Sequence, residues 1–142
     1  MSHHTLYERL GGGAAITAVV DDFAARCAAD SRINPKFART DIARLKAMLV
    51  EQISAATGGK IQYTGRTMSE THRGMQVTAG EFDALVEDLV ATLSTFNVPD
   101  SEQTKLLGIL GPLRAGIVEV ESSETGTPLP DTYQPAPPLA TV

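Results

Sequence analysis

The chain has 142 residues, 42% of them hydrophobic and 20% charged, and its net charge is -5 at pH 7. This length and balance predict one soluble globular domain and exclude a disordered or fibrous chain. The acidic composition argues against nucleic-acid binding, and no apolar run reaches the roughly 18–20 residues that a membrane span requires.

Three helices are predicted before residue 58. A short helix over 5–10 is stopped by the three glycines at 11–13, because glycine lets the chain turn sharply. The second is amphipathic, since apolar residues recur at spacings of three and four from Ile16 to Cys27. A loop is expected over 30–39, followed by a third helix over 41–57 that ends at Gly58-Gly59.

The second half contains two S/T-x-x-E patterns, at 67–70 and 78–81, and each is typical of a capping box at the start of a helix. A helix of barely two turns is therefore expected between them, followed by a regular amphipathic helix from Phe82 to Leu93. The last helix is predicted over 100–120, with Val120 facing inward and a bend at Pro112. With no alternating strand pattern, the prediction is an all-α domain over 1–120.

Residues 121–142 hold five of the eight prolines and few core-forming residues. We expect this segment to be an extended or disordered tail. Its stretches at 127–130 and 135–138 match polyproline II ligands, and a passive tail is the other interpretation.

His72, in the short capped helix, is the only histidine beyond the N-terminal pair His3 and His4, which are interpreted as solvated or tag-derived. One imidazole is too few for a zinc site, which needs three or four ligands. It is enough to hold a haem iron from one side. The alternative is a histidine that packs in the core or caps a helix. The first residues lack a signal-peptide pattern, so we expect a cytoplasmic protein.

Several motifs follow one another in a characteristic order: LYERLGG at 6–12, Asp22-Phe23, Phe37, Gly58-Gly59, YTG at 63–65, His72 and NVP at 97–99. Taken together, they resemble the motifs of truncated haemoglobins of the first group. The resemblance covers about residues 5–120 and implies a two-over-two helical sandwich around haem b.

By this resemblance His72 is the proximal iron ligand and Phe37 stacks on the porphyrin, although ordinary core packing is open for Phe37. Thr40, Arg44 and Tyr63 match positions that hold the haem propionates. For Arg44, whose guanidinium suits a carboxylate, a surface ion pair is the alternative. The haem slot is expected to be lined by Leu45, Met68, Val77, Phe82, Leu85, Leu89 and Leu110.

The distal side departs from the family pattern. After Phe23 the family usually has a tyrosine that donates to bound dioxygen, and this chain has Ala24. The facing glutamine is replaced by Leu49, and the gate position is Leu45. Without a donor, dioxygen retention is expected to fall by about one to two decades, because a hydrogen bond to a charged group is worth roughly 1.5–3 kcal/mol. Carbon monoxide is less polar, so its retention should be weakened less by the missing donor.

Four residues near the distal side have two interpretations each. Gln52 either turns inward as a donor or stays solvated. Met48 fits a sixth iron ligand or core packing, and Lys46 is a weaker candidate for the same role. Cys27 either faces the distal cavity or is a buried inert thiol. At Arg114, relatives with covalent haem have a histidine, so this haem is expected to be non-covalent.

These features favour a haem protein that reversibly binds O2, NO and CO. A nitric oxide dioxygenase or another haem redox enzyme, served by an unidentified reductase, is the alternative. A gas or redox sensor and a haem-free helical interaction module also stay open. Peroxide chemistry is less favoured because no distal acid or base is evident. Neither the physiological ligand nor the oligomeric state follows from the sequence.

Overall fold

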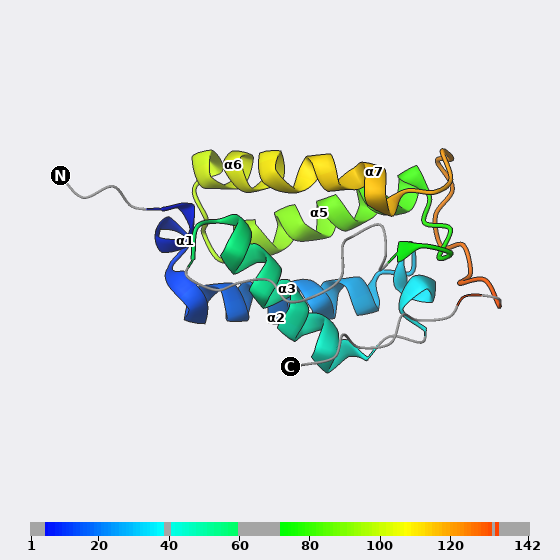
Figure 1. The fold of residues 1–142 in the computed structure, drawn as a ribbon, viewed down its shortest axis with the longest axis horizontal. Coiled ribbons are helices and arrows are strands. Elements are labelled where there is room, and N and C mark those ends of the chain that lie inside the picture. Colours follow the sequence, from blue (N-terminus) through cyan, green and yellow to red (C-terminus); the bar gives the residue numbers. More distant parts are fainter. Residues whose placement is uncertain (1–4, 39–40, 60–71, 132, 134–142) are drawn as a thin grey trace, which may run out of the picture.

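The computed structural model describes residues 5–38, 41–59, 72–131 and 133. Helices make up most of it, in two layers (Figure 1). One layer contains α2 (Gly12–Ala29) with α3 (Ile42–Ala56) crossing it, and the other contains α5 (Ala79–Thr95) beside α6 (Asp100–Leu110). The all-α prediction is confirmed, and the described residues form no strand beyond an isolated bridge between Thr78 and Val120.

Helix α1 (Leu6–Arg9) is short because glycines follow it. Thr5 caps it by accepting a hydrogen bond from the Glu8 amide at 3.1 Å. Gly11 then takes a φ of 106° and begins α2. A Cβ there would lie 2.7 Å from the Cβ of Ala15, so both conformation and space require glycine. The predicted turn at the glycines is confirmed.

The hydrophobic core lies where α2 meets α3 and α5. Val20, Leu93 and Leu106 are almost completely buried. Burying one such side chain stabilises the fold by about 1.5–3 kcal/mol. The cluster consists of Leu6, Ile16, Val20, Phe23, Cys27, Ile33, Ile53, Ala84, Leu89, Leu93 and Leu106.

Helix α5 begins with the predicted capping box. The Thr78 hydroxyl accepts from the Glu81 amide at 3.0 Å, and the Glu81 carboxylate accepts from the Thr78 amide at 2.9 Å. The other capping box, at 67–70, lies outside the described residues. No described helix is both long and apolar enough to cross a bilayer.

The last predicted helix is divided at Pro112. After α6 the chain forms the 3-10 turn η2 (Gly111–Leu113) and then α7 (Arg114–Ile117). The proline lies at the start of η2, as expected for a residue without a backbone donor. The predicted end at residue 120 is wrong, because Val118 is extended. Val120 is 37% exposed rather than inward, since its backbone pairs with Thr78.

The segment after α7 packs across the first turn of α5 (Figure 1). The amides of Glu119 and Val120 donate to the Val77 carbonyl at 2.9 and 3.2 Å, and the Gly80 amide donates to the Ser122 carbonyl at 2.9 Å. A Cβ on Gly80 would collide with the carbonyl oxygens of Ser123 and Glu124. Residues 118–131 contain no helix, yet backbone hydrogen bonds hold them against the helical domain.

Candidate functional site

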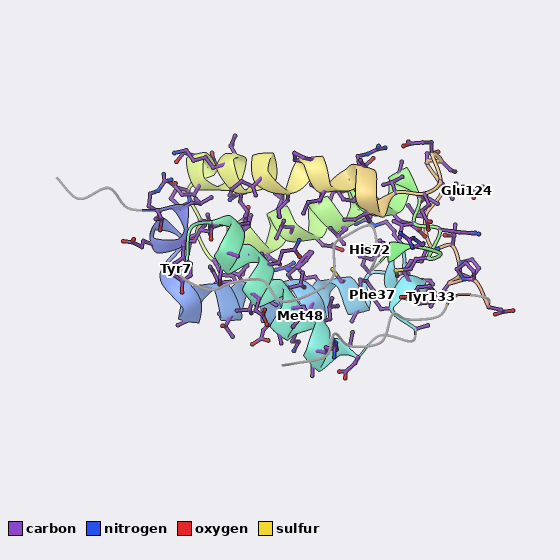
Figure 2. All side chains as sticks on the ribbon, in the orientation of Figure 1. Tyr7, Phe37, Met48, His72, Glu124 and Tyr133 are labelled. Carbon is purple, nitrogen blue, oxygen red and sulfur yellow. The ribbon has the colours of Figure 1, made fainter. Side chains whose placement is uncertain are left out.

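His72 lies at the end of the molecule where α2, the 3-10 helix η1 (Asn34–Phe37) and the beginning of α5 meet (Figures 1 and 2). Its ring is partly buried, and its carbonyl accepts a hydrogen bond from the Met75 amide at 3.1 Å. Phe37 is at the same end, whereas Tyr7 is at the opposite end (Figure 2). The residue predicted to bind iron and the aromatic predicted to stack on the ring thus come from segments 35 positions apart and share one region.

Most of the apolar residues predicted to line the haem slot are buried or partly buried. Val77 and Phe82 are buried, and Leu89 lies deeper in the core cluster. Leu85 of α5 and Leu110 of α6 are partly buried and pack against that cluster. Of the residues predicted to line the slot, Leu85, Leu89 and Leu110 thus belong to or pack against the core cluster, and Val77 and Phe82 are buried as well.

Helices α2 and α3 supply the residues predicted for the distal side. Phe23 and Ala24 are buried on α2. On α3 the buried residues are Ile53 and Ser54 near its C-terminal end, while the preceding part of the helix is less covered. There the predicted pocket residues are all partly exposed: Leu45, Met48, Leu49 and Gln52.

This incomplete burial of apolar side chains on α3 is informative. Leu49 reaches the core cluster, whereas Leu45 and Met48 remain partly open on a helix whose main contacts are with α2. Contact with a flat apolar group would remove this surface from water, and burying apolar surface is favourable by about 25 cal/mol per Å². The side chains on the α3 surface thus suit an apolar cofactor.

The predicted propionate residues are only partly described. Arg44 is exposed on the first turn of α3, where Asp41 caps the helix by accepting from the Arg44 amide at 3.2 Å. The residue proposed to hold a propionate therefore lies near the start of α3 and is open to solvent. The other residues in this set, Thr40, Tyr63 and Met68, lie outside the described residues.

The structure also describes the surroundings of Lys46 and Cys27, the two other residues considered for the distal side. Lys46, an alternative iron ligand by sequence, places its amine 3.4 Å from a carboxylate oxygen of Asp21. Burial raises the pKa of the Cys27 thiol to about 12, helped by the negative charges of Asp88 and Asp30. The thiol is thus protonated at neutral pH, as expected of an inert core cysteine. Within the described ranges no three His, Cys, Asp or Glu side chains gather as metal ligands.

Asp30 and Asp88 form an acidic pair beside Cys27. Arg32 donates to both Asp30 carboxylate oxygens at 3.0 Å, and these bonds lower the pKa of Asp30 to about 2. Asp88 is 3.9 Å from the same guanidinium, and its Oδ2 atom is buried with no hydrogen-bond partner among the described residues. The pKa of Asp88 is raised to about 6, mainly because its carboxyl group is buried. A hydrogen bond with Asp30 and the negative charge of Asp30 raise it further.

This pair makes stability depend on pH in a way that Asp88→Asn should remove. Because the folded pKa of Asp88 lies above its unfolded value, its stabilising contribution is full below pH 4 and is lost as the pH rises through 6. We expect the free energy of unfolding of Asp88→Asn, relative to the unmodified protein, to rise by about 1 kcal/mol between pH 5 and pH 7.5. Urea denaturation at both pH values measures this difference, and an equal difference at both would contradict it.

Sequence reasoning missed a buried ion pair beneath the candidate site. Lys36, next to Phe37, and Glu81, next to Phe82, are both nearly inaccessible, with Nζ 3.6 Å from Oε1. The Lys36 amine donates to Thr127 Oγ1 at 2.7 Å, Thr127 O at 3.1 Å and Pro128 O at 3.0 Å. The remaining Glu81 oxygen accepts from the Thr127 amide and hydroxyl at 2.8 and 2.7 Å. The capping box was the only signal in the sequence. It indicated that Glu81 caps α5 but not that Glu81 pairs with Lys36.

Comparison with known proteins places these features in a family. The family model described as bacterial-like globin matches residues 5–119. A group 1 truncated haemoglobin of Mycolicibacterium paratuberculosis is 34% identical over 122 residues, covering 86% of this chain and 88% of the relative. The group 1 truncated haemoglobin of Synechocystis is 38% identical over 111 residues, and the match covers 75% of this chain and 90% of the relative.

Solved structures agree with the fold. The Fe(III) truncated haemoglobin of Tetrahymena pyriformis superimposes with a TM-score of 0.78 at 31% identity, covering 81% of this chain and 98% of that one. The 2/2 haemoglobin of Synechococcus, whose haem is covalently attached, gives a TM-score of 0.77 at 33% identity, again with 81% and 98% coverage.

Proposed function

The chain belongs to the bacterial-like globin family as a group 1 truncated haemoglobin, and on this premise we propose that it binds haem through His72 and reversibly holds diatomic gases beside an apolar distal wall. The observation that carries the proposal is that one histidine and one aromatic residue lie at the same end of a truncated-globin fold, and that the chain just after this histidine contributes the buried apolar residues Val77 and Phe82.

The residues present fit a haem. The donor set offers one imidazole, and the described part of the chain contains no competing cluster of metal ligands. In this proposal the partly exposed apolar residues on α3 and the buried ones after His72 would contact the two faces of the ring. When bound, haem would supply the iron that a diatomic gas binds, with His72 as the residue that holds it. Phe37, Val77, Phe82, Leu85, Leu89 and Leu110 would pack around the ring, and the Arg44 guanidinium would pair with a propionate.

The distal residues determine which gas is held well. The positions proposed to face the gas on α2 and α3 are Ala24 and Leu49, which have no hydrogen-bond donors. A hydrogen-bond donor at these positions would strengthen the binding of dioxygen more than that of carbon monoxide, which is less polar. We therefore propose a site that releases dioxygen quickly and excludes water through its hydrocarbon walls.

The haem is proposed to be non-covalent. At the start of α7, the Arg114 guanidinium donates to both oxygens of the Glu121 carboxylate at 3.1 and 3.0 Å. A guanidinium stays protonated and has no nucleophilic nitrogen to add to a haem vinyl group.

Haem binding is tested by titrating the purified chain with hemin and recording the visible spectrum. A stoichiometric Soret band supports the proposal, and a chain that stays colourless refutes it. The reduced spectrum then shows whether the sixth position is open or taken by Met48.

The distal proposal predicts the effect of Ala24→Tyr. A tyrosine hydroxyl at this buried position of α2 is expected to slow dioxygen release by about tenfold or more, because a good hydrogen bond to a charged group is worth roughly 1.5–3 kcal/mol. Stopped-flow displacement of dioxygen by carbon monoxide measures the rate. Ala25→Tyr, at the exposed neighbouring position, is the matched control. An unchanged rate in Ala24→Tyr would indicate an existing donor, with Gln52 the first candidate.

A further inference from the structure

The turn that follows His72 has an unusual backbone. Gly74 has a φ of 85° and Gln76 a φ of 56°, so two residues within three positions are left-handed. For a residue with a Cβ this conformation costs roughly 1–2 kcal/mol. Alternating right- and left-handed residues also bring successive amides together in a concave group that attracts an anion. Something in the fold must therefore hold Gln76 in place.

The carboxylate of Glu119 occupies this group of amides. The Gly74 amide donates to Oε1 at 3.0 Å and to Oε2 at 3.2 Å, and the Gln76 amide donates to Oε1 at 2.8 Å. Hydrogen bonds to a charged acceptor are roughly twice as strong as neutral ones. Glu119 thus joins the segment after α7 to the turn that begins two residues beyond His72.

Backbone bonds fix Glu119 in register with this turn. Its own amide donates to Val77 O at 2.9 Å, and the Ala79 amide donates to Val120 O at 3.0 Å. The side chain of Tyr133 lies on the same turn, 3.7 Å from where a Cβ on Gly74 would be. The turn after His72 is therefore held by the C-terminal segment as well as by its own neighbours in sequence.

We propose that Glu119 is a positioning residue for the proximal histidine. By fixing the amides of Gly74 and Gln76, its carboxylate sets the end of the His72 helix and with it the direction in which the imidazole meets the iron. This inference rests on the proposed function, in which His72 is the iron ligand. Groups that orient a metal ligand without touching the metal change metal affinity by 10–100-fold when removed.

Glu121 provides the matched control. It lies two residues further on, is exposed and carries the same charge, but its carboxylate binds Arg114 rather than the turn. Glu119→Ala and Glu121→Ala thus remove the same charge from the same segment. Glu119→Gln keeps an oxygen that accepts from both amides and should restore most of the effect.

The experiment uses the full chain loaded with hemin and has two measurements. Transfer of haem to an excess of a haem-scavenging apoglobin gives the rate of haem loss, and resonance Raman spectroscopy of the ferrous form gives the iron-histidine stretching band. We expect Glu119→Ala to lose haem about tenfold faster and to shift the band, with Glu119→Gln within about threefold of the unmodified rate and Glu121→Ala unchanged.

Amide hydrogen exchange separates positioning from general destabilisation. Faster exchange at Gly74 and Gln76, with unchanged exchange at the core residue Leu93, supports the proposal. Equal acceleration at all three, or a Glu119→Ala protein with normal haem loss and an unshifted band, overturns it. If the unmodified chain itself takes up no hemin, the proposed function fails. If the unmodified chain takes up hemin and Glu119→Ala loses haem at the same rate with an unshifted band, only the inference about Glu119 fails.

Discussion

Replacing His72 with glycine is expected to weaken haem binding at least about 100-fold, because removing groups that merely orient a metal ligand already costs 10–100-fold. The loss arises from the missing coordinate bond, since the apolar contacts of the slot remain. Titration with hemin, followed at the Soret band, gives the affinity. Adding free imidazole should restore the spectrum of a histidine-ligated haem, because glycine leaves a space where the side chain was.

The control for this substitution is Arg73→Gly, at the exposed neighbouring position. It brings the same extra backbone freedom to the turn but removes no proposed ligand. We expect its haem affinity to stay close to that of the unmodified chain. An unaltered spectrum in His72→Gly would mean that another side chain binds the iron, and equal losses in both variants would mean that the turn rather than the ligand matters.

Lys36→Met is expected to lower the free energy of unfolding by about 3–5 kcal/mol, the usual cost of leaving one member of a buried ion pair without its partner. The substitution keeps most of the side-chain volume. It removes three hydrogen bonds to Thr127 and Pro128 and leaves the Glu81 carboxylate buried without its cation. Urea denaturation of the haem-loaded protein, followed by far-ultraviolet circular dichroism, measures the change.

Lys46→Met is the matched control, because Lys46 also pairs with a carboxylate, that of Asp21, but at the surface. Exposed pairs contribute about 1 kcal/mol or less. The double variant Lys36→Met/Glu81→Leu should be less destabilised than the sum of the two single changes, since the unpaired charge is then gone. A loss below about 1 kcal/mol in Lys36→Met would show that the pair does not hold the C-terminal segment.

Local elements follow closely from local sequence. The Thr78–Glu81 capping box, the glycine start of α2 and the interruption at Pro112 each involve residues within a few positions of one another. Their geometry is set by steric limits on one or two residues and by hydrogen bonds within a single turn. The end of the last helix was mispredicted because the competing partner, Thr78, lies more than 40 residues away from Val120 in the chain.

In the candidate site, too, some residues could be predicted from the sequence and others could not. His72 is conspicuous because a globular chain with one internal histidine offers few other iron ligands. The roles predicted for Phe37 and the apolar slot residues come from the resemblance to truncated haemoglobins and remain predictions. The positions of Thr40, Tyr63 and Met68 are untested by the described residues. Glu119 shows no local pattern, since it is one acidic residue among several after α7.

The amino-acid sequence alone determined the helical class and the capped start of α5, because each depends on side-chain type and short spacing, and its resemblance to a known family supplied the proposed iron ligand. Only the tertiary structure decided that residues 118–131 belong to the packed domain. Lys36 bonds to Thr127, 91 residues away, and Glu119 bonds to Gly74, 45 residues away. Such pairings depend on how the layers bring distant charged and polar groups together, where burial makes an unpaired group costly.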